Sequence, residues 1–542
     1  MIRRFFSNHV HIDKSYLLSS LKTRWTSLVY YHSDSIEGNT IPEESIFNEQ
    51  RLSSQEATGI LRTHEASIDM ESHCPVKYYE MNYLGANNPP GMHRTTSLSL
   101  RSNCFLFAFE EDRQAQARIH SSTSNMYLFG VFDGHGGPWC SDVVGQRLFE
   151  YIAVTLHAPD DLQRIMTEAK RILSHPHPPT HHLHSHPSDK ISSNPFTSLL
   201  LQSFHYPYKD TRNSRIKEIH QLNLLKHIED AYTNIDHDHT EIMAALESAF
   251  SKLDRDICAE AIPIDTQAVD EELLQICTAG SCACVALIKD DDLYIANCGD
   301  ARAIIGTIDE EGKHGVIHLS HDHNIRNQAE VKRVLAEHPP NESHSVIRSD
   351  RLLGLLMPFR AFGDVRFKWP ANYLREYLQP YYKKGDAIPQ FYLTPPYLTV
   401  KPEITKHKLN KKDKFLLLAT DGVWDLLSPE KVVESVFNHQ KGIQSFDRFV
   451  LHKSGHGATS LKLKEINQLL LARHQAIKNQ PIDQNSATHL IRQALAFTSK
   501  GQFDSKLLSD VLTIPNPRSI RDDITITVVY FDQDFFDQIP RK

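Results

Sequence analysis

Aspartates adjoin several apolar, strand-like segments of this 542-residue chain. Asp133 follows the run Met126–Phe132, and Asp421 comes just after Phe415–Ala419. Two further acids adjoin such segments, Asp300 and Asp522. An acid beside glycine is also a common turn signal, so each aspartate alone has a structural interpretation. Together, carboxylates at one end of a sheet would repel one another unless hard cations such as Mg²⁺ or Mn²⁺ neutralised them, so the pattern predicts an oxygen-ligand metal site.

Two such cations sharing one carboxylate are suited to hydrolysing phosphate esters. They lower the pKa of a water between them and neutralise charge on the phosphoryl oxygens. The leaving alkoxide then needs a proton, and His135, two residues beyond Asp133, is placed to supply it. The alternative roles for His135 are metal ligand and packed structural residue. Gly134, between them, would let a backbone carbonyl approach a cation.

Competing phosphoryl chemistries lack their signatures in this sequence. Arg147 follows Cys140 one residue too late for the cradle of a cysteine phosphatase. We find no G-x-x-x-x-G-K-[ST] nucleotide loop, no kinase catalytic segment and no G-x-S-x-G nucleophile. Hydrolysis by a metal-activated water is therefore the predicted chemistry.

Alternating strand-like and helix-like segments must position these residues. Strands are predicted at Met126–Phe132, Cys282–Ile288, Leu293–Asn297, Ala301–Ile308, Phe415–Ala419 and Ile524–Phe531. Helices are predicted at Pro138–His157, Thr240–Ala261, Arg326–Glu337, Pro429–His439 and Ala487–Phe497, with a short one near Leu461–Ile477. Residues 283–289 and 293–297 form a predicted hairpin. Hairpins with helices between them predict an α+β fold of antiparallel sheets covered by helices.

Composition excludes several protein classes. The chain has 59 Lys and Arg against 67 Asp and Glu, a net charge of −8, and 40% apolar residues. These values argue against collagen-like, coiled-coil and disordered chains, and against the positive field typical of nucleic-acid binding. No apolar run approaches the roughly 18–20 residues that span a membrane. The eight cysteines form no CxxC pair, which favours a reducing compartment.

Three segments stand apart from the predicted domain. Residues 1–33 carry five basic residues against one acid, which is typical of a mitochondrial transit peptide; a solvated basic tail is the alternative. The rest forms one predicted domain over about 60–532, with insertions at about 159–238 and 440–485. Residues 174–187 are rich in His and Pro and could bind metal, but proline opposes one ordered ligand cage, so we expect a flexible surface insertion.

The acidic segments occur in an order that resembles the metal-dependent type-2C Ser/Thr protein phosphatases. They are Val-Phe-Asp133-Gly-His-Gly-Gly, Gly280-Ser281, Asn297-Cys-Gly-Asp300-Ala-Arg, Asp421-Gly-Val-Trp-Asp425 and Arg521-Asp522-Asp523. Within the family, residues 351–369, 394–403 and 485–492 resemble the branch that acts on mitochondrial pyruvate dehydrogenase. The resemblance covers about 60–532.

This resemblance implies a four-layer sandwich, with two central antiparallel β-sheets flanked by helices and a binuclear Mg²⁺ or Mn²⁺ site at one end. It implies that Asp133 bridges both ions, that Gly134 offers its carbonyl, and that Asp421 and Asp522 complete one ion's ligands. His135 matches the family's general acid. Further acids match positions near a third ion or acting through water: Asp300, Asp425, Glu111 and Asp112.

One departure concerns the residue that grips phosphate. Many relatives carry an arginine four residues before the acid matching Glu111, where this chain has Phe107. The pyruvate dehydrogenase branch uses asparagine instead, and Asn103 lies nearby. The phosphate-gripping residue is thus left open.

The implied enzyme is a mitochondrial matrix phosphatase that hydrolyses phosphoserine on the decarboxylase component of the pyruvate dehydrogenase complex. A metal-bridging hydroxide would attack phosphorus in line, without a phosphoenzyme. Implied partners are the lipoyl domain of the acetyltransferase core, in some isoforms through Ca²⁺, and a regulatory subunit. Two alternatives are kept: the same chemistry on another mitochondrial phosphoprotein, and an inactive family member that serves as a scaffold.

Overall fold

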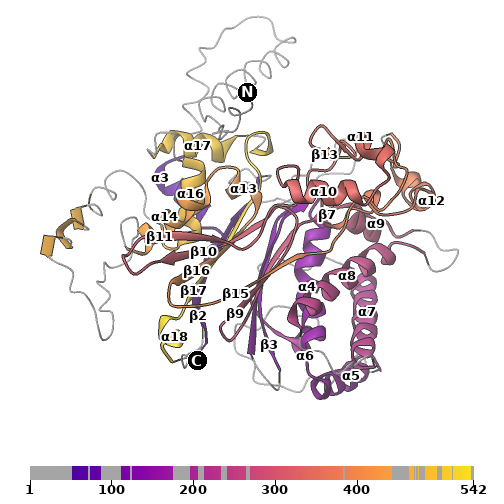
Figure 1. Cartoon of the computed structure of the whole chain (residues 1–542), viewed down its shortest axis with the longest axis horizontal. Coiled ribbons are helices and arrows are strands. Elements are labelled where there is room, and N and C mark those ends of the chain that lie inside the picture. Colours follow the sequence, from indigo (N-terminus) through magenta and orange to yellow (C-terminus); the bar gives the residue numbers. More distant parts are fainter. Residues whose placement is uncertain are drawn as a thin grey trace, which may run out of the picture. The chain divides into compact units, whose positions relative to one another are not determined.

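The computed structural model describes most of the chain beyond residue 51 (Figure 1). The described residues are 52–70, 74–86, 111–121, 125–174, 196–205, 213–233, 241–263, 269–382, 385–441, scattered positions between 463 and 474, 483–496, 503–514 and 517–538. Several predictions lie outside them: the transit peptide at 1–33, Asn103, Phe107, the His/Pro segment beyond 174 and most of 440–485. The chain divides into a smaller unit, Met1–Thr63, Ala86–Leu106 and Ser435–Asp522, and a larger unit comprising the rest.

The larger unit contains two six-stranded sheets in which every neighbouring pair is antiparallel. The first has the order β1 (Ala66–Asp69), β2 (Val76–Leu84), β17 (Ile524–Phe531), β16 (Asp413–Ala419), β10 (Arg302–Ile308) and β11 (His314–His318). The second has the order β15 (Glu403–Lys408), β9 (Asp292–Cys298), β8 (Ala283–Lys289), β4 (Asn125–Phe132), β3 (Arg113–His120) and β6 (Gln202–His205). The predicted hairpin is confirmed as β8–β9.

Strand β4 explains how the sheets pack. Its alternate residues point to opposite faces. Phe129 and Val131 join a buried cluster with side chains of the first sheet, while Leu128 and Phe132 join a second cluster formed with helices. A strand buried on both faces reads as a continuous apolar run, as β4 does in the sequence.

Helices cover that second face in the larger unit (Figure 1). They are α4 (Trp139–Leu156), α5 (Pro159–Ser174), α6 (Thr197–Leu200), α7 (Ser214–Thr233), α8 (Ile242–Glu260) and α9 (Glu271–Thr278). The residues Ile242, Leu246, Phe250, Leu253 and Ile257 recur at helical spacing, and helix α8 buries the last four of them. The predicted α+β class, with two antiparallel sheets flanked by helices, is confirmed. The stretch 159–238 contains α5 and α7, two regular helices that the sequence analysis did not identify.

Short elements complete the larger unit. Three two-residue strands form a small sheet: β5 (Gly134–His135), β7 (Gly280–Ser281) and β14 (Phe362–Gly363). The others are α10 (Gln328–Ala336), η1 (Pro340–Glu342), α11 (Ser343–Val346), β12 (Ile347–Arg348), β13 (Arg351–Leu352), η2 (Val365–Phe367), α12 (Ala371–Tyr373), η3 (Leu374–Leu378), η4 (Gln379–Tyr381), α13 (Asp421–Trp424), α14 (Pro429–Gln440, which ends in the smaller unit) and α18 (Gln533–Gln538).

The smaller unit contains α3 (Ser54–Leu61), α16 (Ser486–Ala496), α17 (Ser505–Thr513) and η5 (Pro517–Ser519). The buried Arg492 guanidinium binds the Asp483 carboxylate, with contacts of 2.6–3.0 Å, and reaches Thr58 of α3 at 3.3 Å. Residues described between 463 and 474 are helical, as predicted for that segment.

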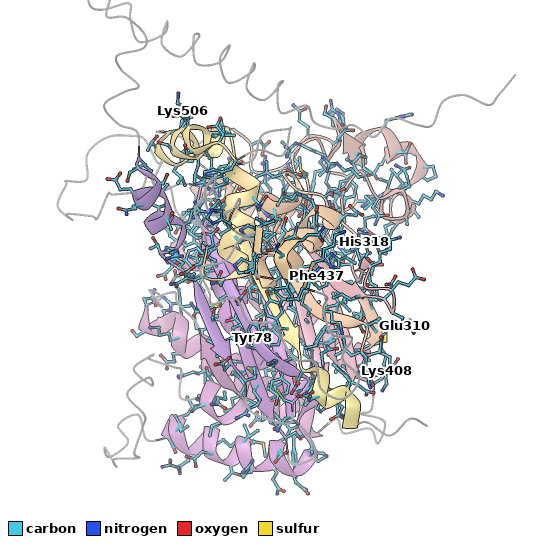
Figure 2. The ribbon with its side chains drawn as sticks, turned by 90° about the vertical axis from the view of Figure 1, so that its left-hand side faces the viewer. Tyr78, Glu310, His318, Lys408, Phe437 and Lys506 are labelled. Atoms are coloured by element: carbon cyan, nitrogen blue, oxygen red, sulfur yellow. The ribbon has the colours of Figure 1, made fainter. Side chains whose placement is uncertain are left out.

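Strand β15 forms an edge of its sheet and carries charged side chains outward. Lys406 pairs with Asp292 at 3.0 Å, and Lys408, labelled in Figure 2, pairs with Asp291 at 2.5 Å. Charged residues on an edge strand discourage pairing with another chain.

Among the described residues, no helix is both long and apolar enough to cross a membrane.

A buried ion pair joins α8 to the loop after β14. The Lys368 ammonium lies 2.7 and 2.8 Å from the two Asp254 carboxylate oxygens, and it also donates to the Ala361 carbonyl at 2.8 Å. The Gly363 N–H donates to the same carboxylate at 2.8 Å. This pair holds the end of β14 against the helical layer.

We predict that Lys368→Met lowers the free energy of unfolding by about 3–5 kcal/mol, because it leaves the Asp254 charge buried without its partner. Lys431→Met is the matched control, since Lys431 and Glu434 form an exposed pair at 3.0 Å; its effect should stay below about 1 kcal/mol. Urea unfolding of the three proteins measures the difference. Equal effects of the two substitutions would contradict the prediction.

Candidate active site

Three of the predicted acids meet at one end of the two large sheets. Asp133, Asp300 and Asp421 each present a carboxylate oxygen, and these oxygens lie within 4.8 Å of one another. Asp133 follows β4, Asp300 lies two residues after β9, and Asp421 begins α13 after β16. The strand ends thus bring together acids that are up to 288 residues apart in the chain.

Cys282 links two of these acids. Its N–H donates to the Asp133 carbonyl at 2.8 Å, and its carbonyl accepts from the Asp133 N–H at 3.2 Å. Its thiol donates to an Asp300 carboxylate oxygen at 3.3 Å. Gly299 has φ +117°, and a Cβ there would lie 2.2 Å from the Cys282 sulfur, so only glycine fits this turn.

The three carboxylates fit hard divalent cations. Burial, reinforced by the carboxylate of Asp322, raises the pKa of Asp300, which means that its negative charge is poorly compensated by the protein. Oxygen donors gathered at this spacing suit Mg²⁺ or Mn²⁺. Gly134 is needed next to them, because a Cβ there would lie 2.2 Å from the Glu111 carbonyl oxygen.

His135 is held by a residue that the sequence analysis did not assign to the site. Its Nε2 lies 2.6 Å from an Asp364 carboxylate oxygen. The small sheet produces this contact: His135 pairs with Gly280, which in turn pairs with Gly363. A Cβ on Gly280 would lie 2.0 Å from His135 Nε2, so a side chain there would displace the imidazole.

The electrostatics of His135 follow from these neighbours. Burial lowers the pKa of the imidazole, but the carboxylates of Asp364, Asp300 and Glu111 outweigh it, and the pKa is raised above its ordinary value. A protonated imidazole in such a site can donate a proton to a leaving group.

Asp364 adopts a left-handed conformation, with φ +52°. Such strain in a residue other than glycine is concentrated at functional positions. A signal for it existed in the sequence: Gly363-Asp364 resembles Gly299-Asp300, with glycine before an acid. Only the register of two-residue strands, however, places Asp364 beside His135.

Glu111 and Asp112 brace the loops around the carboxylates. Glu111 accepts from the Gly137 N–H at 2.8 Å, and its own N–H donates to the Asp523 carboxylate at 2.7 Å. Asp112 accepts from the Thr420 hydroxyl at 2.8 Å. Both residues therefore position the segments that carry Asp133 and Asp421.

Two other predicted acids, Asp425 and Asp522, form ion pairs with arginine. Asp425 is one helical turn beyond Asp421, and its N–H donates to the Asp421 carbonyl at 2.9 Å. Its carboxylate lies 3.8 Å from the Arg326 guanidinium. Asp522 belongs to the smaller unit, where it lies 3.6 Å from Arg518. The metal-ligand role of Asp522 stays a prediction.

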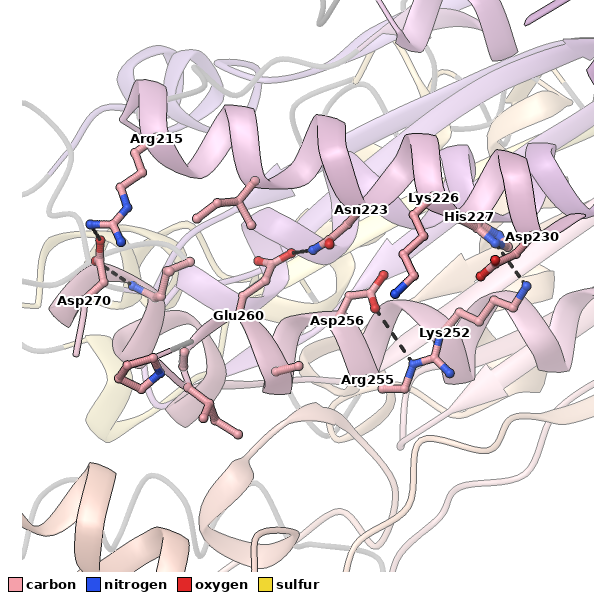
Figure 3. A pocket seen from close by; sticks show the side chains of 16 residues that line it. Arg215, Asn223, Lys226, His227, Asp230, Lys252, Arg255, Asp256, Glu260 and Asp270 are labelled. Atoms are coloured by element: carbon pink, nitrogen blue, oxygen red, sulfur yellow. Dashed lines mark hydrogen bonds and ion pairs between the residues drawn. The ribbon is translucent and has the colours of Figure 1, made fainter. Parts of the chain in front are cut away.

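A separate cavity of about 790 Å³ opens between α7 and α8 (Figure 3). None of the acids discussed above lines it. Four basic and four acidic side chains line it, and two ion pairs join some of them, Arg215 with Asp270 at 3.7 Å and Arg255 with Asp256 at 3.9 Å. Burial, together with the nearby Lys252, lowers the pKa of His227 to about 3. This cavity therefore has no excess of positive charge for a phosphorylated ligand.

Comparison with known proteins places the chain in a family. Residues 191–470 match the family model described as Protein phosphatase 2C. The chain is 35% identical over 516 residues to human pyruvate dehydrogenase (acetyl-transferring) phosphatase 2, mitochondrial, covering 92% of this chain and 86% of that protein. It is 39% identical over 435 residues to the Bos taurus phosphatase 1 of the same description, with coverages of 78% and 75%.

A more distant relative is the Saccharomyces cerevisiae phosphatase 1 of that description, which is 28% identical over 442 residues, with coverages of 76% and 63%. The match to the family model and the high coverage of the human and bovine relatives agree with the order of the acidic motifs in this chain. The chain therefore belongs to the protein phosphatase 2C family, as a phosphoprotein phosphatase closely related to the pyruvate dehydrogenase phosphatases.

Proposed function

We propose that this enzyme hydrolyses phosphoserine on the decarboxylase component of the pyruvate dehydrogenase complex in the mitochondrial matrix, with Mg²⁺ or Mn²⁺. The convergence of Asp133, Asp300 and Asp421 within 4.8 Å carries the chemical part of the proposal. The names of the relatives support the substrate and the compartment. The lipoyl domain of the acetyltransferase core, Ca²⁺ in its docking, and a regulatory subunit are proposed partners.

The residues would divide the work between holding cations and moving a proton. Asp133, Gly134, Asp421 and Asp522 would hold two cations, and the remaining acids of the site, Asp300, Asp425, Glu111 and Asp112, would hold a third or act through water. Bound divalent cations supply a water of lowered pKa and positive charge for the phosphoryl oxygens.

His135 would give its proton to the leaving serine oxygen. The Asp364 carboxylate, 2.6 Å from Nε2, orients the ring and favours its protonated form. Because the Asp364 carboxylate fixes the His135 ring before the P–O bond breaks, less entropy is lost in reaching the transition state.

The substrate is tested with the intact, phosphorylated pyruvate dehydrogenase complex and a phosphorylated branched-chain dehydrogenase as its rival. We expect Mn²⁺-dependent phosphate release to be faster from the first. The reverse preference would favour another mitochondrial phosphoprotein. Absence of turnover on phosphopeptides and phenyl phosphate alike would favour the scaffold alternative.

We predict that Asp133→Asn abolishes measurable turnover, because one carboxylate fewer holds the cations and several kcal/mol of transition-state stabilisation are lost. Glu310→Gln is the control, since Glu310 is 88% exposed and lies outside the site. Phosphate release from a phosphoserine peptide in saturating Mn²⁺ measures both. Near-normal activity of Asp133→Asn would contradict the assignment.

Metal binding also predicts how Asp133→Asn changes thermal stability. Relative to the wild type, the variant should be more stable with chelator and less stable with saturating Mn²⁺. With chelator present, Asp133→Asn should melt at a higher temperature than the wild type, because one of three repelling charges is gone. With Mn²⁺ at about a hundred times its Kd, the wild type should gain about 2.7 kcal/mol, and the variant much less. Thermal melts of both proteins, with and without Mn²⁺, test this. An equal gain in both proteins would argue against cation binding at Asp133.

The raised pKa of His135 gives a pH prediction. Activity requires the protonated imidazole, so it falls as pH rises through the pKa of His135. Asp364→Asn removes a carboxylate that raises this pKa, and the alkaline limb of kcat should therefore move to lower pH. At neutral pH, kcat on a phosphoserine peptide should fall by about 10- to 100-fold. An aryl phosphate with a good leaving group should be affected less. If the alkaline limb of kcat for Asp364→Asn stays at the pH of the wild type, Asp364 does not raise the pKa of the proton donor.

A further inference from the structure

The loop of residues 319–327, between β11 and α10, is fastened to the turn that carries Asp300. The His323 N–H donates to the Gly299 carbonyl at 2.9 Å, and the Gly299 N–H donates to His323 Nδ1 at 3.0 Å. The Asn297 amide donates to the His321 carbonyl at 3.2 Å. The position of this loop is therefore fixed relative to one of the three converging carboxylates.

The same loop presents Arg326 on a rigid base. The Arg326 N–H donates to the Asn324 side chain at 3.0 Å, and the Asn327 amide donates to the Asp322 carbonyl at 3.0 Å. His323 and Asn324 are buried, whereas the Arg326 side chain is 68% exposed. A fixed backbone with an exposed cationic head is the arrangement of a recognition residue, because little chain entropy is lost when it binds.

The one ion pair of Arg326 in the described residues does not account for this arrangement. Its guanidinium lies 3.8 Å from the Asp425 carboxylate, which is itself 58% exposed, and exposed pairs of this kind contribute little to stability. The neighbouring Arg302 differs: it is 20% exposed and makes two contacts with Asp322, at 2.5 and 2.7 Å. Arg302 thus donates two hydrogen bonds to Asp322, whereas the Arg326 guanidinium donates none within the described part of the chain.

Asp425 also locates Arg326 with respect to the chemistry. Asp425 lies one helical turn from Asp421, and its carboxylate lies 3.8 Å from the Arg326 guanidinium, which relates Arg326 to one of the three converging acids. A phosphoprotein carries oxyanions on its phosphoryl group and on any acidic residue beside the phosphoserine. Guanidinium binds both kinds through charge-assisted, often paired hydrogen bonds.

We propose that Arg326 binds an oxyanion of the phosphoprotein substrate and so contributes to substrate specificity. This inference rests on the proposed phosphatase function. Arg326 acts in binding and not in bond cleavage, so its loss raises KM and leaves kcat nearly unchanged.

The test compares Arg326→Gln with Arg164→Gln. Arg164 is a matched control, because it is 76% exposed and its ion pair with Asp161, at 3.3 Å, lies on α5. Three substrates separate the sources of the oxyanion: phenyl phosphate, a phosphoserine peptide with neutral neighbours, and the same peptide with an aspartate next to the phosphoserine. All measurements use saturating Mn²⁺.

We expect Arg326→Gln to raise KM by about tenfold for at least one substrate, with kcat within about twofold. A rise in KM for all three substrates would show that Arg326 binds the phosphoryl oxygens. A rise in KM for the aspartate peptide alone would show that it binds the flanking carboxylate. Arg326→Lys should recover part of the loss, since it keeps the charge without the paired donors.

Three outcomes overturn the proposal. The first is an unchanged KM on all substrates, and the second is a KM rise equal to that of Arg164→Gln. The third is a rise that disappears when more Mn²⁺ is added, because Arg326 would then act only on the metal site through Asp425. If the wild type hydrolyses none of the substrates, the proposed function itself fails, and that result is distinct from the other three.

Discussion

Repulsion among carboxylates is the constraint that organises this end of the molecule. Asp133, Asp300 and Asp421 come within 4.8 Å of one another, and no folded chain gathers such charges without fixing their backbones first. The fixation comes from strand ends: β4, β9 and β16 are central or near-central strands whose positions depend on the two buried cores. The energy of apolar burial thus opposes the electrostatic cost of the site.

The small sheet of β5, β7 and β14 supplies the second part of the site. It has only two residues per strand, yet its register brings His135, Gly280 and Gly363 side by side. Glycine at the central position leaves room for the imidazole and the Asp364 carboxylate to meet. The Lys368–Asp254 pair then holds β14 against α8. The small sheet therefore positions the His135 ring, whereas the converging acids follow strands of the two large sheets.

The sequence predicted the elements whose pattern is strong and missed those whose pattern is mixed. The apolar strands β4, β8, β16 and β17 and the striped helix α8 were foreseen because both faces, or one long face, are apolar. Strand β3 was not, since alanine alternates there with polar residues: Gln114 is buried and accepts from Thr527 of the other sheet. Asp364 was missed because its partner is 229 residues away and the connecting strands are too short to leave a periodic signal.

Cys282 couples the positions of Asp133 and Asp300. Its backbone is hydrogen-bonded to that of Asp133, and its thiol donates to the Asp300 carboxylate, so one residue positions both acids. Any shift of this one residue is transmitted to both side chains at once. The spacing between these two anionic groups therefore depends on the position of this one residue.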